Sequence, residues 1–471
     1  MAALPYLWIL WDLWNGSLSF LRTAEPNGYA SNFYDLQARA MVHGHLFAAN
    51  GALGGEAFVH DGRQYTYFGL FPSLLRVPIL LLTHSLDGRL TAPSMLLAWL
   101  TAALFSSLLV WRVRVLVRGP AVLGLTEAAS HGVLLATIMG GSVLMSLASD
   151  PWVFSEDLAW SVALTIASLF ALLGVLERPS SSRVVASGAL ILAANLTRAT
   201  TGYACVIGAV LVAMWFALGR GGVVNRRWAL PMLMAGVVPL AAGCAITYAK
   251  FGIWFGLPVA DQIVYQSFGL SHVGNGGYFG FRFLPSTALA YLQPTGLRLT
   301  PVFPFITLPS APARMVGGVL LYGSDRTASA PASMPLLVLA GLWGVISAFR
   351  PRPVGRSNLF RIVLVAAAAG AGTVMIYGWI ENRFLADFVP LLVLASAIGL
   401  VDVWRRLEPD RRRIRLLTLA IVTVVGLFEI AANVGMAVTP QSTWTGSQVL
   451  RYVEFQKSMS DLTGHPLAEN V

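Results

Sequence analysis

The sequence contains few charged residues. Only 11% of its 471 residues are Asp, Glu, Lys or Arg, whereas 56% are hydrophobic. Ordinary soluble domains carry about 25% charged residues. A soluble fold of this composition would expose large apolar patches, so lipid is the expected solvent. The scarcity of charge therefore predicts an integral membrane protein.

Cysteine is also scarce, and several common catalytic motifs are missing. Cys205 and Cys244 both fall inside apolar runs, which argues against a disulfide framework or a cysteine zinc site. His43, His45 and His60 match no zinc spacing, so we expect no metal cofactor, although a divalent metal is conceivable. Walker A, GxSxG and HExxH patterns are absent, so ATP-driven transport and the common hydrolases lack their motifs.

The net charge of +10 does not indicate a nucleic-acid partner. The basic residues form short clusters between apolar runs, as expected for cytoplasmic loops of a membrane protein. A spanning helix needs about 20 mostly apolar residues. Candidate spans lie near residues 3–21, 92–111, 122–147, 158–177, 184–197, 203–219, 229–250, 333–349, 358–379, 387–403 and 416–437. The sequence thus predicts an all-α, polytopic transmembrane bundle of about 11 spans within residues 1–437, followed by a tail at 438–471.

The first apolar run begins almost at Met1, without a basic n-region or a small-residue cleavage site. It also contains Asp12 and Asn15, so we expect it to be retained as the first span rather than removed as a signal peptide. Its abrupt start leaves open a cytoplasmic leader before it.

Five arginine clusters orient the predicted bundle. They lie at residues 112–118, 178–183, 220–227, 350–361 and 405–415. All five fall on the cytoplasmic side if the N-terminus is cytoplasmic and the segment Phe68–Thr83 does not cross the membrane. That segment contains Arg76 between two prolines, which disfavours a lipid-facing helix. The long loops 22–91 and 251–331 and the tail then lie on the outer side of a multi-pass plasma (inner) membrane. Short outer loops are predicted at Ser149–Asp157 and Tyr377–Asp387.

The first outer loop offers a candidate catalytic carboxylate, Asp35. Residues Asn32 to Val42 are expected to form an interfacial amphipathic helix, on which Asp35 and Arg39 are i,i+4 partners. Its apolar residues recur at spacings of three and four: Phe33, Leu36 and Ala40. The carboxylate would suit a base that meets a lipid-borne substrate, but it could equally belong to a solvated face held by the ion pair.

A second acidic group, Asp150, Glu156 and Asp157, follows in the stretch SDPWVFSED. Paired carboxylates can share acid and base roles or orient an acceptor hydroxyl. Alternatively they cap the next helix, since Ser155 followed by acidic residues is a good helix start.

Arg198 and Arg383 lie at the outer ends of membrane runs. An arginine at hydrocarbon depth normally faces a polar cavity or a partner, and its planar fork matches phosphate. The alternatives are snorkelling to the headgroups and, for Arg383, simple neutralisation by Glu381. Tyr67 lies in an aromatic group that is typical of an interfacial belt, and it could also stack on a sugar.

The order of these features resembles membrane glycosyltransferases of the GT-C superfamily, which use polyprenyl-phosphate sugars as donors. The stretches that carry the resemblance are FYDLQARAMVHGHL, the segment from SEDLAW to LTRATTG, and ENRFLADFVPLLVLA. They resemble the family's acidic motif after the first helix, its helix–basic loop–helix unit ending in LTR, and its late arginine before a proline-containing helix. The likeness covers about the first 400 residues, but the first motif has one acid where many relatives have an adjacent pair.

The resemblance implies an inverting hexosyl- or pentosyltransferase, such as a mannosyl- or arabinosyltransferase. The Arg-rich, Lys-poor residue usage is typical of a high-GC bacterium, so we expect a cell-envelope glycan or glycolipid as the acceptor. The resemblance also implies that Asp35 is the general base, that Arg198 and Arg383 stabilise the departing phosphate, and that Glu156 and Asp157 orient the acceptor. Other candidate substrate-binding residues are Arg39, His43 and Tyr67. A monophosphate leaving group does not require a metal. A flippase for a lipid-linked sugar, or a non-catalytic assembly subunit, remains an alternative at this stage.

Overall fold

The computed structural model describes residues 2–11, 30–120, 122–220, 223–267, 277–351, 356–407, 411–439 and 446–464. Helices dominate these ranges, as the sequence predicts, and the long apolar helices mark an integral membrane protein. Six segments of the described chain are long and apolar enough to cross a membrane: Thr91–Arg118, Val153–Glu177, Ala199–Ala217, Asn225–Phe251, Asn382–Arg406 and Arg412–Ala437.

The long α-helices in these segments are α4 (Thr91–Arg118), α7 (Val153–Glu177), α9 (Ala199–Ala217), α10 (Ala229–Phe251), α16 (Val389–Arg406) and α17 (Arg412–Ala437). The 3₁₀ helices η3 (Val223–Trp228) and η8 (Asn382–Phe388) lead into α10 and α16. The shorter helices of the bundle are α5 (Leu125–Gly140), α6 (Leu144–Ser149), α8 (Ser181–Asn195), α14 (Pro335–Ala348) and α15 (Phe360–Met375), with η7 (Ser357–Leu359) before α15.

Every predicted span from residue 92 onward contains a helix, but the count of about 11 stays a prediction. Helices α8, α14 and α15 have 15, 14 and 16 residues, fewer than an ideal span needs. The predicted span 122–147 is divided between α5 and α6 near Gly141. The predicted span 3–21 contains α1 (Ala3–Leu10), and its remainder, with Asp12 and Asn15, lies outside the described residues.

Helices α7 and α16 form the centre of the bundle and are buried along most of their length. Helices α14 and α16 cross closely because a Cβ atom at Gly344 would lie 1.9 Å from the carbonyl oxygen of Ala395. Small residues at such crossings let helix backbones approach each other. Because α7 lies at the centre of the bundle, the polar side chains at its beginning are surrounded by protein rather than by lipid.

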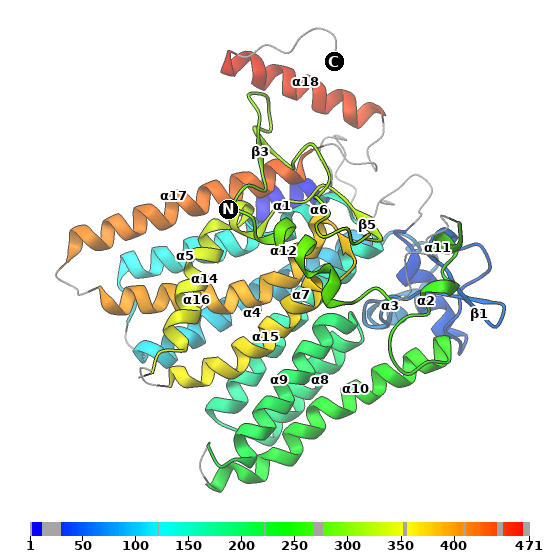
Figure 1. Cartoon of the computed structure of the whole chain (residues 1–471), viewed down its shortest axis with the longest axis horizontal. Coiled ribbons are helices and arrows are strands. Elements are labelled where there is room, and N and C mark those ends of the chain that lie inside the picture. Colours follow the sequence, from blue (N-terminus) through cyan, green and yellow to red (C-terminus); the bar gives the residue numbers. More distant parts are fainter. Residues whose placement is uncertain are drawn as a thin grey trace.

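Two arginines of the first predicted cytoplasmic cluster pair with glutamates of neighbouring helices. Arg112 near the end of α4 lies 3.7 Å from Glu177 at the end of α7, and Arg118 lies 2.7 Å from Glu127 in α5. The predicted outer loop elements α2 and α3 lie on the opposite side of the bundle from the end of α16 and the beginning of α17 (Figure 1). Which of these sides faces the cytoplasm stays a prediction.

The first long loop folds into α2 (Phe33–Val42), η2 (Gly54–Glu56), the hairpin of β1 (Phe58–His60) and β2 (Arg63–Tyr65), and α3 (Phe71–Leu82). The buried ammonium of Lys250 at the end of α10 donates hydrogen bonds to the carbonyls of Thr66 (3.0 Å) and Phe68 (2.9 Å). The backbone at Gly69 passes so close to α8 that a Cβ atom would lie 2.0 Å from the carbonyl oxygen of Leu196. The loop is thereby fixed against α8 and α10.

The prediction that α2 lays its apolar face on the membrane surface is wrong. Phe33 and Ala40 are 1% and 4% exposed because α2 packs against protein, including α3. The second half of the loop supplies apolar surface that the periodicity of α2 alone cannot reveal.

The second long loop consists of short elements that reach the segment before α16. They are η4 (Val259–Asp261), α11 (Ile263–Ser267), η6 (Phe281–Phe283), α12 (Leu284–Leu292), β3 (Arg298–Leu299), β4 (Ile306–Thr307), β5 (Gly323–Ser324) and α13 (Ala330–Ser333). Strand β5 pairs in parallel with β6 (Trp379–Ile380), and β3 pairs antiparallel with β4. Helix α18 (Gly446–Thr463) lies apart from the bundle (Figure 1).

Candidate active site

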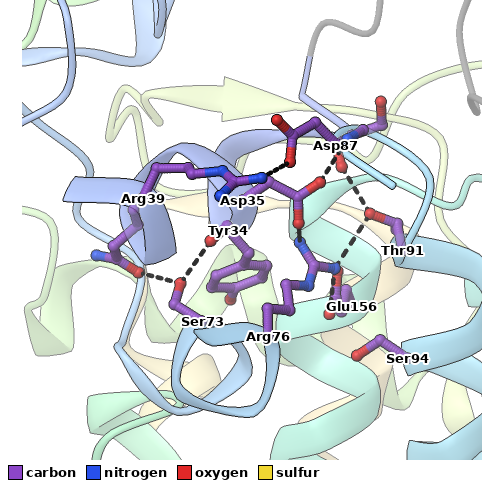
Figure 2. Close-up of polar contacts among 12 residues, drawn as sticks. Tyr34, Asp35, Arg39, Ser73, Arg76, Asp87, Thr91, Ser94 and Glu156 are labelled. Carbon is purple, nitrogen blue, oxygen red and sulfur yellow. Dashed lines mark hydrogen bonds and ion pairs between the residues drawn. The ribbon is translucent and has the colours of Figure 1, made fainter. Parts of the chain in front are cut away.

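Arg76 of α3 lies at the centre of a buried charge cluster (Figure 2). Its Nη1 donates to Asp35 Oδ1 (2.8 Å), and its Nη2 donates to both carboxylate oxygens of Glu156 (2.8 and 2.6 Å). The same Nη2 donates to the hydroxyl of Thr91 (3.3 Å), at the start of α4. One guanidinium thus ties α2, α3, α4 and α7 together. Arg76 is absent from the site residues that the sequence predicts.

Asp35 is 3% exposed, and both of its carboxylate oxygens accept hydrogen bonds. Besides the contact with Arg76, its Oδ2 accepts from the backbone N–H of Gly88 (2.6 Å). Gly88 has φ 73°, a conformation that glycine adopts without strain. Burial raises the pKa of Asp35, and the neighbouring Arg76 and the Gly88 amide partly offset that rise.

Arg39 is not the partner of Asp35, so the predicted i,i+4 pair is wrong. Its guanidinium donates to the carbonyls of Leu80 and Thr83 at the end of α3 and to the carboxylate of Asp87 (2.8 Å). Unpaired carbonyls at a helix end are strong acceptors for a cation, and they lie within reach of this long side chain.

His43, at the C-cap of α2, is exposed and stacks 6.3 Å from His45. Within the described residues it has no contact with the charge cluster. Tyr67 is half-buried and stacks on Phe68 at 4.2 Å. Burial is the main cause that raises the pKa of the Tyr67 phenol well above its ordinary value, and the charges of Glu56 and Arg383 also act on it. Tyr67 therefore lies near the second arginine predicted for the site.

Glu156 and Asp157 are buried inside α7, and they do not cap it. The helix begins at Val153 with Trp152 as the N-cap, so Ser155 is already helical and the capping alternative is wrong. Glu156 is 0% exposed and binds Arg76. Asp157 accepts from the Tyr34 hydroxyl at Oδ1 (3.3 Å) and from Arg198 Nη1 at Oδ2 (3.1 Å).

Arg198 and Arg383 converge on one aromatic ring. Their guanidinium carbons lie 5.7 and 5.6 Å from the ring centroid of Phe384. Arg198, which precedes α9, also lies 3.5 Å from Asp387 Oδ2, so it is paired with buried carboxylates and does not snorkel. Arg383 lies 2.7 Å from Glu381, as the neutralisation alternative predicts.

These contacts form one network around the beginning of α7. The adjacent residues Glu156 and Asp157 connect the Arg76 half to the Arg198 half, and Tyr34 and Asp35 of α2 do the same from the other side. Carboxylates outnumber guanidinium groups in this network. Binding of an anionic ligand is therefore favoured when one of these carboxyl groups is protonated, or when the ligand displaces a carboxylate from its arginine.

The described residues contain no group of three or more His, Cys, Asp or Glu side chains that could hold a metal ion. No family model matches the chain, and no curated protein matches it.

The chain is similar to solved structures of two proteins. One is the oligosaccharyltransferase AglB from Archaeoglobus fulgidus in complex with an inhibitory peptide and a dolichol-phosphate, with 16% identity and a TM-score of 0.49. That match covers 94% of this chain and 56% of the other, so the chain spans about half the length of AglB. Another is ArnT from Cupriavidus metallidurans bound to undecaprenyl phosphate, with 13% identity, a TM-score of 0.43, and coverage of 96% and 76%.

Proposed function

We propose that the protein is an inverting glycosyltransferase that moves a sugar from a polyprenyl monophosphate donor to a hydroxyl of a cell-envelope glycan or glycolipid at the outer membrane face. One observation carries this proposal. The carboxylate of Asp35 and the guanidinium of Arg198 belong to a single buried network at one end of the bundle, linked through Arg76, Glu156 and Asp157. Sugar transfer from a lipid phosphate needs a base and a phosphate-stabilising cation within one such site.

In this mechanism the acceptor hydroxyl gives its proton to Asp35. The acceptor oxygen attacks the anomeric carbon, and the bond from that carbon to the phosphate oxygen breaks on the opposite face, which inverts the configuration. The bonding electron pair leaves with the phosphate, whose charge Arg198 and Arg383 stabilise. Asp35 can take the proton at Oδ2 when the Gly88 N–H releases it, while Arg76 continues to hold Oδ1.

The pH dependence of transfer should report the ionisation of Asp35. Burial raises the pKa of Asp35 above 3.8, and a protonated carboxyl group cannot act as the base. We therefore expect kcat/KM to fall as the pH decreases through a value above 3.8. Initial rates measured across pH, with protein integrity checked at each pH, test this. An acid limb at or below pH 3.8 would exclude Asp35 as the titrating base.

Glu381 should limit the affinity for the anionic donor because its carboxylate forms an ion pair with Arg383 and competes with the donor phosphate. Burial raises the pKa of Glu381, and Arg383 partly offsets that rise. Below its pKa, Glu381 is neutral and releases Arg383, so the affinity for a polyprenyl phosphosugar should increase as the pH falls. Glu381→Gln should increase affinity about three- to tenfold at neutral pH, an effect of about 1 kcal/mol, and flatten this dependence.

The phosphodiester donor is the right probe for Glu381, because it does not titrate near neutral pH. Glu454→Gln, on the exposed face of α18, is the matched control and should leave affinity unchanged. Weaker donor binding by Glu381→Gln than by wild type would mean that Glu381 holds Arg383 in its binding position rather than competing for it.

A reconstituted assay tests the proposed function itself. Purified protein in lipid vesicles is offered radiolabelled polyprenyl-phosphate mannose or arabinose together with a cell-envelope glycolipid fraction. A new glycosidic product with inverted anomeric configuration supports the proposal. Movement of the labelled headgroup across the bilayer without a new glycosidic bond would show a flippase, and would contradict it.

A further inference from the structure

Asp387 differs from the other carboxylates that contact Arg76 or Arg198. Asp35, Glu156 and Asp157 each have both oxygens engaged in hydrogen bonds. Asp387, in η8, is 2% exposed, and its Oδ2 lies 3.5 Å from Arg198 Nη2. Its Oδ1 is buried and has no hydrogen-bond partner within the described part of the chain.

The arginine of this ion pair also has an unused atom. Arg198 Nη1 donates to Asp157 and Nη2 faces Asp387, whereas the buried Nε lacks a partner among the residues that the structure describes. Leaving such an atom unpaired in a buried site is unfavourable, so buried polar atoms normally have a partner. One ion pair thus presents an unpaired acceptor and an unpaired donor in the same buried site.

The chemistry of the two atoms selects the ligand group. A hydroxyl can donate to Asp387 Oδ1 and accept from Arg198 Nε, since it carries both a hydrogen and lone pairs. A phosphate oxygen could accept from Nε but would be repelled by the carboxylate. An ammonium group could donate to Oδ1 but has no lone pair for Nε.

We infer that Asp387, together with Arg198, binds a hydroxyl of the donor sugar. This inference rests on the proposed function. In the donor, the sugar is bonded directly to the phosphate that Arg198 and Arg383 hold. A ring hydroxyl is therefore only a few bonds from the phosphate and can reach the same guanidinium. Asp387 then distinguishes the sugar-bearing donor from the bare polyprenyl phosphate that remains after transfer, and helps the product lipid to leave.

The affinity ratio between the two lipids tests this inference. Binding of a polyprenyl phosphosugar (the mannosyl or arabinosyl form that wild type turns over) and of the same polyprenyl phosphate without sugar is measured for wild type and Asp387→Ala. Wild type should prefer the phosphosugar, and Asp387→Ala should reduce that preference about tenfold or more, as expected for loss of a hydrogen bond to a charged group. In turnover, KM for the donor should rise while KM for the acceptor stays constant.

Asp387→Asn keeps the size of the side chain, and it provides the same test if the alanine variant does not fold. It should reduce the preference by a smaller factor, because the amide oxygen can still accept a hydrogen bond without the charge.

Glu429→Gln is a matched control for both Asp387 variants. Glu429 of α17 is also a buried carboxylate whose Oε1 has no partner in the described chain, while its Oε2 accepts from the backbone N–H groups of Leu336 and Leu337. This variant should leave the lipid preference unchanged.

Two results would overturn the inference while leaving the proposed function intact. An equal loss of affinity for both lipids in Asp387→Ala would show that Asp387 only holds Arg198 in place. An unchanged preference, with or without a higher KM for the acceptor, would show that no donor hydroxyl binds there. If wild type binds neither lipid, the proposed function fails together with the inference.

Discussion

Replacing Asp35 with asparagine should reduce sugar transfer by about 10²- to 10⁴-fold, the contribution expected from a positioned general base. Asparagine has the same shape, and its amide oxygen can still accept from Arg76, whose contact with Glu156 is unaffected. The amide cannot take a proton from the acceptor hydroxyl. We therefore expect kcat to fall while donor affinity changes by less than about threefold, because base catalysis and phosphate binding use different side chains.

Asp87→Asn is the matched control for this substitution. Asp87 is a carboxylate of the same loop, but it is 41% exposed in its side chain and pairs with Arg39 on the outside of the cluster. The control should retain near wild-type turnover. If Asp35→Asn also retains turnover, Asp35 has no role as the base, and the buried charge cluster serves the fold instead.

Much of the candidate site could be predicted from the sequence because its motifs are local. Asp35 in FYDLQAR, the pair Glu156 and Asp157 in SDPWVFSED, and Arg198 in LTRATTG each lie at an end of an apolar run. Helices that cross the same bundle bring those of their ends that lie on one side close to each other, whatever the detailed packing. The structure places all four residues in one network.

The partners within that network could not be predicted, because they depend on tertiary packing. Arg76 pairs with residues 41 and 80 positions away, and Tyr34 reaches Asp157 across 123 positions. From the sequence, Arg76 only indicates that its segment does not face lipid. The clue to its role is that an arginine in an apolar segment needs carboxylate partners, and the nearby motifs supply several.

The number of helices that cross the membrane also depends on tertiary packing. Hydropathy measures how apolar a run is, but it does not show whether lipid or other helices cover that run. Helices α14 and α15 are apolar yet short, and one side of each packs against other helices of the bundle. Their apolar composition serves protein packing as well as any contact with lipid, so hydropathy alone does not distinguish a full span from a packed apolar helix.

Replacing Arg76 with methionine should cause the largest loss of stability among single substitutions in this cluster, about 3–5 kcal/mol in the free energy of unfolding. Arg76 is 2% exposed, and its removal would leave the carboxylates of Asp35 and Glu156 buried without their cation. Methionine fills a similar volume, so the loss reports the unpaired charges rather than a cavity. Unfolding in mixed detergent micelles, followed by tryptophan fluorescence, measures the effect.

The buried carboxylates also provide a rescue experiment. If unpaired charge causes the instability, the triple variant Arg76→Met, Asp35→Asn, Glu156→Gln should recover most of the lost stability although it cannot transfer sugar, because neutral amides cost less to bury than ions. Arg406→Met is the control, because it removes an arginine without leaving a carboxylate unpaired: Asp402, the partner of Arg406, also binds Arg405. This variant should lower the free energy of unfolding by at most about 1 kcal/mol. A triple variant as unstable as Arg76→Met alone would show that Arg76 stabilises the site through packing on the Tyr34 ring, 5.4 Å away, rather than through charge. The cluster would then be held together by shape, and Asp35 and Glu156 would tolerate a neutral neighbour.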